Sequence, residues 1–522
     1  MCVTIPRRQF LLTAAGLSLP AVAHGQITTG AVPASYFRGE PLRIGNQFQY
    51  LMDEYLVEDR WMLKRTLGKV LKHQRNPVLV QDKPWEEAIG AYPSVLHDPH
   101  TGKFRMWYQI FSLTNYFARE KGPSYYIGYA ESEDGYNWTK PALEGFPFLS
   151  YERTNIVTTG RGGRRASAPH VFLNPDTSDP RRRYMMVYMG YGKADLAYSP
   201  DGLHWDIVDK PLAEYHTDFP NHLVWVPEQK LWFLYVRPAV RIVQGGTGPL
   251  PEGSRHTARR LAVSISSDLV NWSLPRTVLY PDERDEPDYD MVYVFRRHGL
   301  FIGLYAQMQQ EKGGSENQVY LATSRDGIHW DRTWDRQPFI PRGREGSYDA
   351  GQVEPSTSPP IESGPDLLMY YYSAPFGQNH PFNDTGVGLC RMRRDRFIGQ
   401  FAGDPSGYDR GGQAGILVTR QFVLEGNQLQ LNFSAFPGPY HQPTDGIRVG
   451  IVEAPNFKTP ATRYETAVPG FALEDCDRLV GDGLETPVKW KGSSDLSSLK
   501  GRAIYLRFEM RKAGLYGFRI VA

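Results

Sequence analysis

The chain has 522 residues, more than one hydrophobic core usually spans, so two domains are expected. Its 59 basic and 57 acidic residues leave a formal net charge of only +2, without a long basic run, which argues against nucleic acid as a partner. Aromatic residues make up 13% of the chain, and the 51 Gly and 40 Pro are typical of strands separated by many turns. The composition therefore predicts an all-β protein.

The first 25 residues have the pattern of an export signal. Arg7 and Arg8 precede a short apolar run, which ends in small residues that suit a cleavage site. This run is too short to cross a bilayer, and no other segment is apolar enough, so we expect no membrane insertion. Paired arginines favour the twin-arginine export machinery as a partner, with an ordinary secretory signal as the alternative. Both pathways place the mature chain, from about Gln26, in the periplasm or outside the cell.

One turn recurs four times along the middle of the chain. Each copy has Ser two positions before an Asp and Trp four positions after it, as in Ser132, Asp134 and Trp138. The four aspartates, which are about 60 to 70 residues apart, suit elaborated propeller blades: Asp134, Asp201, Asp268 and Asp326. Since Asp can accept backbone N–H bonds and Trp can pack on a blade, we expect these turns to be structural.

Three strands are predicted before each turn, the first unit comprising residues 92–97, 104–111 and 125–132. Three similar units follow, and a fifth ends in a degenerate turn at Asp395. These units predict a five-bladed β-propeller over residues 26–410, with residues 48–57 joining the last blade to close the ring. From residue 411 to 522 the repeat stops, and alternating strands predict a C-terminal β-sandwich.

This layout resembles the five-bladed glycosyl hydrolase superfamily, which includes the family 43 arabinanases and xylosidases and the family 32 invertases and levanases. The resemblance extends over the whole mature chain, with aromatic second strands such as Met106-Trp107-Tyr108. Three motifs look like those of a family-32-like group of exported bacterial proteins: Pro84-Trp85-Glu86, Asp201-Gly202-Leu203-His204-Trp205 and Phe471-Ala472-Leu473-Glu474-Asp475-Cys476-Asp477. The Trp-Met-Asn-Asp-Pro-Asn-Gly segment of the invertases is missing, so invertase activity is not expected.

The resemblance implies a glycoside hydrolase that acts on plant or microbial oligosaccharides or polysaccharides. It also implies an Asp, an Asp and a Glu brought to the propeller mouth by three different blades. Hydrolysis needs a protonated carboxylic acid and a carboxylate that activates water or attacks carbon. Glu86 is the expected general acid, because the neighbouring Trp85 would desolvate it. Asp290 and Asp349 are the expected base or nucleophile and the carboxylate that modulates it.

The segments just ahead of each blade's first strand also supply the expected substrate-binding residues: Trp85, His170, Asp218, Tyr348 and Glu354. Blade two offers His170 where the superfamily has an acid, and this residue is either an ordinary strand-end histidine or a group that holds a sugar hydroxyl. Trp85 and Tyr348 are either stacking platforms for a sugar or core aromatics. Three basic residues fall at the same mouth: Arg164, Arg165 and His216.

No cofactor and no required metal ion are expected. The acidic segment 282–288 lacks the glycine and the spacing of an EF-hand loop, which leaves open only a structural calcium ion. Two other functions also stay open. One is a glycan-binding propeller without catalysis. The other is a polysaccharide lyase, in which His170 or Tyr348 would abstract a proton beside a uronate carboxylate that Arg164 or Arg165 neutralises.

Overall fold

The computed structural model describes residues 41–117, 122–238, 259–286, 288–311, 314–333, 335–378, 380, 384–403, 414–435, 443–453 and 464–522. The expected export signal, residues 1–25, lies outside these described residues. Within them the chain is almost entirely β, with one short α-helix, α1 (Leu113–Phe117). The described residues contain no helix of the length and apolarity that a bilayer crossing needs.

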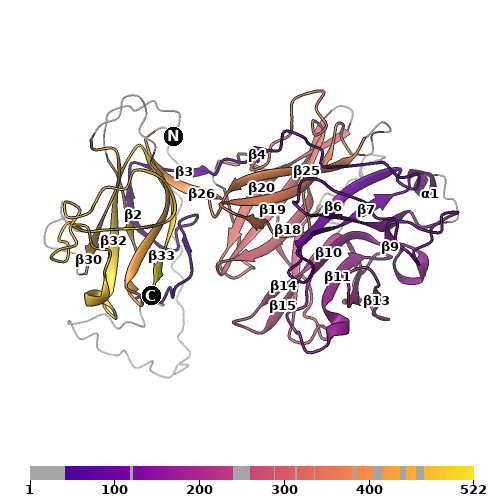
Figure 1. Cartoon of the computed structure of the whole chain (residues 1–522), viewed down its shortest axis with the longest axis horizontal. Helices are drawn as coiled ribbons and strands as arrows, with labels where there is room; N and C mark the ends of the chain where they lie inside the picture. Colours follow the sequence, from indigo (N-terminus) through magenta and orange to yellow (C-terminus); the bar gives the residue numbers. More distant parts are fainter. Residues whose placement is uncertain are drawn as a thin grey trace, which may run out of the picture.

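Figure 1 shows two bodies of unequal size. The larger body contains the strands from β4 (Leu71–Lys72) to β25 (Gly386–Arg393). The smaller body contains β2 (Val57–Trp61), β32 (Ala503–Arg511) and β33 (Ala513–Val521), so both ends of the described chain contribute to it.

Three four-stranded antiparallel sheets follow one another in the first part of the larger body. The central strand β7 (Phe104–Phe111) is buried along nearly its whole length and is rich in aromatic residues, which favour a pleated, packed surface. The other strands of these sheets are β6 (Ala88–His97), β8 (Tyr125–Ser132), β9 (Ile156–Thr158), β10 (Ser167–Leu173), β11 (Tyr184–Met189), β12 (Ala194–Ser199), β13 (Asp206–Ile207), β14 (Thr217–Val226), β15 (Leu231–Pro238), β16 (Leu261–Ser266) and β17 (Arg276–Leu279).

Two further units complete the larger body. The fourth comprises β18 (Tyr289–Arg297), β19 (Leu300–Glu311), β20 (Gly314–Ser324) and β21 (Asp331–Arg332). The fifth comprises β22 (Gln352–Pro355), β23 (Ile361–Ser363), β24 (Asp366–Ala374) and β25. A parallel pairing of Asn317 with Gln352 joins β20 to β22, so the two units form one continuous sheet.

The outer edge of the fifth unit is covered by an early part of the chain. Both β4 and β5 (Leu79–Val80) pair with β25. Residues 48–57 do not take this place, because β1 (Gln49–Tyr50) pairs with β33, and β2 pairs with β27 (Gly415–Thr419). The expectation that residues 48–57 join the last blade is therefore wrong. A short alternating segment fits the edge of any sheet, so its pattern does not identify its partner.

The first strands of the five units contact one another in a ring. β6 contacts β10, β10 contacts β14, β14 contacts β18, β18 contacts β22, and β22 contacts β6 again. Because these strands surround one axis, residues near their starts come from distant parts of the sequence and still meet. The ring of first strands therefore brings together the residues of the candidate site.

The repeated turns fold through their own side chains. Asp134 accepts hydrogen bonds from the backbone N–H groups of Tyr136 and Asn137, both at 2.8 Å. Burial acts to raise the pKa of Asp134, but these bonds and others outweigh it and lower the pKa to about 2. In the third turn Leu269 adopts a φ of 62°, where the other copies have Gly. The turns are thus local structural units.

The smaller body is built from two sheets that share one hydrophobic core, which includes Leu417, Leu431 and Phe508. One sheet contains β3 (Leu63–Leu67), β26 (Ile398–Ala402), β33, β29 (Gln428–Ala435) and β31 (Gly481–Pro487), with β1 at its side. The other contains β2, β27, β32, β28 (Phe422–Val423) and β30 (Gly446–Val452). Since β26 already belongs here, the change of sheet comes before the expected boundary at residue 410.

Candidate active site

A cavity of about 980 Å³ lies where the first strands of the ring begin. Its volume is in the range of small-molecule sites. Aromatic side chains form much of its wall: Tyr92, Phe111, Tyr116, Tyr125, Phe219 and Tyr372. Five charged side chains also line it: Arg165, Asp218, Arg237, Arg259 and Glu354. Apolar walls with a few convergent charged groups are typical of a binding or catalytic site.

Two buried carboxyl groups meet beside this cavity. Asp290 in β18 and Glu354 in β22 are each 1% exposed. The side-chain amide of Asn317, in β20, donates to Asp290 Oδ2 at 2.9 Å and to Glu354 Oε1 at 2.7 Å. Burial, and then the charge of Asp290, raise the pKa of Glu354 well above its usual range. The surroundings of Glu354 therefore favour its protonated form.

Two arginines compensate the charge of Asp290. Arg237 Nη1 donates to Asp290 Oδ1 at 3.1 Å, and Arg259 Nη1 donates to the same oxygen. Arg237 also donates through Nη1 to the backbone carbonyl of Asp290 and through Nη2 to Asp218 Oδ2. Arg237 thus ties the start of β18 to Asp218 in β14.

Asp218 lies at the cavity with its side chain 42% exposed. Burial acts to raise the pKa of Asp218, but the adjacent Arg237 guanidinium outweighs burial, and the pKa is lowered. The surroundings of Asp218 therefore favour the ionised carboxylate, whereas those of Glu354 favour the protonated acid. Two carboxyl groups whose surroundings push their pKa values apart are the usual basis of acid and base roles.

The structure places Glu86 in a separate cluster away from this cavity. Its carboxylate is buried and accepts from Tyr108 Oη at 2.7 Å and from the backbone N–H of Asp82 at 3.0 Å. Lys140, whose side chain is only 2% exposed, forms an ion pair with Glu86 at 2.7 Å. The expectation that Glu86 is buried beside Trp85 is met, but its partners are those of a structural ion pair.

Replacing Glu86 with Gln is expected to cost about 3 kcal/mol of stability, because it leaves Lys140 buried with only the partly exposed Asp82 as a carboxylate partner. Urea unfolding measures this change. Any catalytic activity of the folded variant should stay close to that of the wild type. Glu87→Gln, at the exposed neighbouring position, is the control and should leave stability nearly unchanged. Loss of activity in folded Glu86→Gln would contradict this structural role.

Asp349 and Tyr348 lie together at the closure of the ring, not at the cavity. Asp349 pairs with Lys72 Nζ from β4 at 2.5 Å and accepts from Tyr371 Oη at 3.2 Å. The Tyr348 hydroxyl lies 2.5 Å from Tyr371 Oη and accepts from Asn76 Nδ2 at 2.9 Å. These contacts hold the early strand β4 against the fifth unit. The three carboxylates expected to be catalytic therefore lie in three separate places.

Trp85 and His170 are not among the residues that line the cavity either. Trp85 packs in a hydrophobic core and donates from Nε1 to Asn155 Oδ1 at 2.9 Å. His170 is buried inside the ring, with Nδ1 2.7 Å from the carbonyl of Thr357 and Nε2 3.1 Å from that of Leu223. Burial lowers the pKa of His170 to about 4. Both residues are built into the interior.

Of the expected site residues, Asp218 and Glu354 line the cavity, and Asp290 adjoins Glu354. Arg165 and His216, two of the basic residues expected at the mouth, line it as well. Sequence reasoning missed Arg237, Arg259 and Asn317. None of the three lies just ahead of a first strand, and no local pattern distinguishes them from surface residues. Only their contacts across the ring reveal them.

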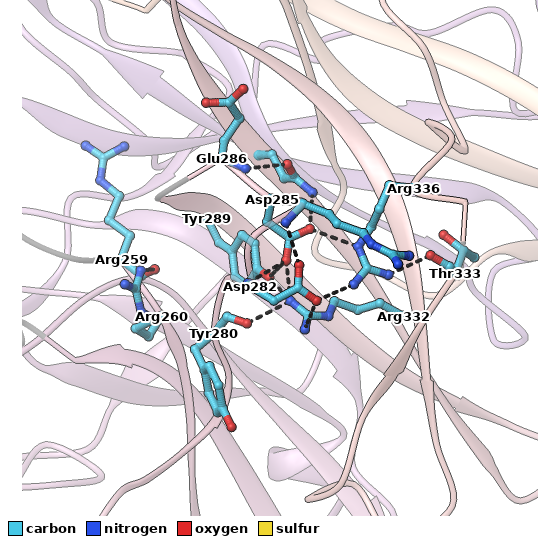
Figure 2. Close-up of polar contacts among 12 residues, drawn as sticks. Arg259, Arg260, Tyr280, Asp282, Asp285, Glu286, Tyr289, Arg332, Thr333 and Arg336 are labelled. Atoms are coloured by element: carbon cyan, nitrogen blue, oxygen red, sulfur yellow. Dashed lines mark hydrogen bonds and ion pairs between the residues drawn. The ribbon is translucent and has the colours of Figure 1, made fainter. Parts of the chain in front are cut away.

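The acidic segment before β18 is paired with arginines (Figure 2). Asp282 contacts Arg332 Nη2 at 2.8 Å and Arg336 Nη2 at 2.6 Å, and Asp285 contacts the same two arginines. No group of three or more His, Cys, Asp or Glu side chains suited to a metal ion occurs in the part of the chain that the structure describes. Asp282 and Asp285 are thus paired with guanidinium groups.

No protein-family model and no curated protein matches this sequence. Among solved structures, the catalytic domain of the Coprinopsis cinerea GH62 α-L-arabinofuranosidase is similar at 14% identity and a TM-score of 0.42, over 62% of this chain and 97% of that chain. An N-acetylgalactosamine deacetylase from F. plautii is similar at 15% identity and a TM-score of 0.42, over 63% and 96%. The β-1,2-mannobiose phosphorylase from Listeria innocua has 15% identity and a TM-score of 0.42, over 62% and 97%.

Proposed function

We propose that this protein is a glycoside hydrolase whose larger body is a five-bladed β-propeller and whose smaller body is a β-sandwich. The observation that carries the proposal is that two carboxyl groups with opposite pKa shifts line one cavity, with the pKa of Glu354 raised and that of Asp218 lowered. Asp218, Asp290 and Glu354 come from β14, β18 and β22. Their types and their origin in three units agree with the superfamily pattern of an Asp, an Asp and a Glu. The substrate is an oligosaccharide or polysaccharide.

In this mechanism Glu354 is the general acid and gives its proton to the glycosidic oxygen as the bond from that oxygen to the anomeric carbon breaks. Asp218 either takes a proton from the attacking water or attacks the anomeric carbon itself. The buried charge of Asp290 keeps Glu354 protonated until substrate binds. Glu354 thus takes the role first expected of Glu86. Asp218 and Asp290 replace the expected pair of Asp290 and Asp349 as the base or nucleophile and the carboxylate that modulates the site.

The aromatic wall supports a sugar as the substrate. Tyr125 stacks on Phe111, with ring centroids 4.6 Å apart, and Phe219 lies 5.1 Å from Tyr92. Rings held by one another in this way offer apolar faces at little cost in conformational entropy. The C–H face of a pyranose or furanose ring would pack on them, while its hydroxyls reach the charged groups.

Replacing Asp218 with Asn tests the proposal. On a panel of aryl glycosides and oligosaccharides we expect the wild type to release sugar, and Asp218→Asn to lower kcat by at least about 100-fold, because the base or nucleophile is gone. Asp209→Asn, which changes an exposed aspartate, is the matched control. Full activity of Asp218→Asn would contradict its assigned role. Binding without any product would favour a glycan-binding protein, and an unsaturated uronate product would favour a lyase.

We further propose export through the twin-arginine machinery to the periplasm or the cell exterior. This proposal is based on Arg7, Arg8 and the apolar run that follows them. The chemistry proposed above uses carboxyl groups alone and requires no cofactor.

A further inference from the structure

The cavity contains a guanidinium group, that of Arg165, that forms no ion pair with a carboxylate of the described residues, although its charge contributes to the lowered pKa of Asp218. The Arg165 side chain lines the cavity and lies over the ring of Tyr125, with its Cζ 4.3 Å from the ring centroid. Its Nε is buried and donates no hydrogen bond to any described residue. By contrast, Arg237 pairs with Asp218 and Asp290. Arg165 therefore has hydrogen-bonding capacity that the described protein does not use.

The position of Arg165 is fixed before any ligand arrives. The backbone N–H of the next residue, Ala166, donates to the carbonyl of Tyr125 at 3.0 Å. Gly160 adopts a φ of 79°, and a Cβ there would collide with the Arg165 carbonyl. Tyr125 is itself held against Phe111. A guanidinium stacked on such a ring loses little further freedom when it binds an anion.

The guanidinium groups around the cavity are not all paired with carboxylates of the described residues. Three guanidinium groups, those of Arg165, Arg237 and Arg259, lie around the cavity, and ion pairs join Arg237 to Asp218 and Asp290 and Arg259 to Asp290. The surroundings of Glu354 favour its neutral form. Among the described residues, Arg165 is the one of these three guanidinium groups that forms no ion pair with a carboxylate. Such a charge is costly to bury alone and is stabilised by a ligand of opposite charge.

We propose that the cavity binds a saccharide with an anionic substituent, and that Arg165 contacts this substituent. The shared chemistry is that of a uronate carboxylate or a sulfate ester, whose oxygens match the planar donor array of a guanidinium. A neutral sugar would leave Arg165 unpaired. Because Glu354 and Asp218 would then act on this sugar, the inference rests on the proposed function and names its substrate class.

Calorimetric titration of the whole protein tests this inference without requiring turnover. The probes are glucuronate and galacturonate oligosaccharides, sulfated galactose oligosaccharides, and the neutral counterparts of each. We expect one anionic class to bind about 10- to 100-fold more tightly than its neutral counterpart, the usual effect of a charge-assisted hydrogen bond, and binding to weaken as salt is added. The class that binds distinguishes a carboxylate from a sulfate.

Variants at two adjacent positions complete the test. Arg165→Met is expected to remove the preference for the anionic sugar, and Arg165→Lys to restore part of it, because lysine keeps the charge but not the planar array. Arg164→Met, at an exposed position outside the cavity, is the control and should bind as the wild type does. Equal binding of anionic and neutral sugars, or equal effects of Arg165→Met and Arg164→Met, would overturn the inference.

Failure of this inference can be told apart from failure of the proposed function. If the protein binds anionic sugars through Arg165 but hydrolyses none, the hydrolase proposal fails and the role of Arg165 stands. If it hydrolyses neutral glycosides as well as anionic ones, and Arg165→Met affects both equally, the hydrolase proposal stands and the role of Arg165 fails.

Discussion

Glu354→Gln is expected to lower kcat by about 10²- to 10⁴-fold, the range over which general acid catalysis contributes. The amide has nearly the shape of the protonated acid, and its oxygen can still accept from Asn317 as Oε1 does now. It has no acidic proton to give to the leaving oxygen. Initial rates on the best substrate of the panel measure the loss, and circular dichroism verifies the fold.

The pH dependence of the wild type follows from the same carboxyl group. Burial, and then the charge of Asp290, raise the pKa of Glu354, so the catalytically competent acid form persists to a higher pH than in an exposed Glu. Activity that depends on this acid is lost as pH rises through the raised pKa. In Asp290→Asn, we expect the alkaline limb of the kcat/KM profile to move to lower pH, because the charge that holds the proton on Glu354 is removed.

The raised pKa of Glu354 should also make the free energy of unfolding depend on pH. A group whose pKa is raised on folding contributes stability that is fully present below its unfolded pKa and is lost as pH rises through its folded pKa. Glu354 is such a group, and Gln at this position does not titrate. The free energy of unfolding of Glu354→Gln should therefore rise relative to that of the wild type as pH increases. Urea unfolding at several pH values measures the difference.

Glu87→Gln serves as the control for the activity measurement, since Glu87 is exposed and accepts from Ser112 Oγ and Thr114 rather than lining the cavity. It should retain nearly full kcat. If Glu354→Gln instead keeps the kcat of the wild type and its alkaline limb is unchanged, the general acid is another group.

Asp285→Asn is expected to destabilise the protein by about 3–5 kcal/mol, the usual cost of removing one partner of a buried ion pair. The Asp285 side chain is 0% exposed. It contacts Arg332 and Arg336, and it accepts from Tyr289 Oη at 2.8 Å and from Gln307 Nε2 at 3.0 Å (Figure 2). The neutral amide would leave two largely buried guanidinium groups with Asp282 as their shared carboxylate.

Denaturant unfolding at neutral pH measures this loss. Glu283→Gln, two positions earlier on the exposed side of the segment, is the control and should change stability by less than about 0.5 kcal/mol. A similarly small effect of Asp285→Asn would contradict the structural role of the network. The ion pairs of Asp282 and Asp285 with Arg332 and Arg336 join the segment before β18 to the segment after β20. We therefore also expect their loss to make the position of Asp290, at the start of β18, less well fixed.

The local elements of this protein were determined by its sequence alone. The expected segments 104–111 and 125–132 coincide with β7 and β8. The carboxylate of Asp134 accepts backbone N–H groups in its turn, as its spacing to Ser132 and Trp138 predicts. These features depend on side chains within a few positions of one another, where turn chemistry and alternation act directly.

Only the tertiary structure decided which charged groups meet. Glu86 is buried near Trp85 as expected, but Lys140, 54 positions away, supplies its countercharge. Asp290 and Glu354 share Asn317, a residue with no local signal, and Asp290 is paired with Arg237, in β15, and with Arg259, just before β16. The place of residues 48–57 was likewise decided by β33 and β27, which lie hundreds of residues later. The physical reason is the same in each case: carboxylates in similar loops are alike in sequence, and their protonation depends on burial and on charges that folding brings near.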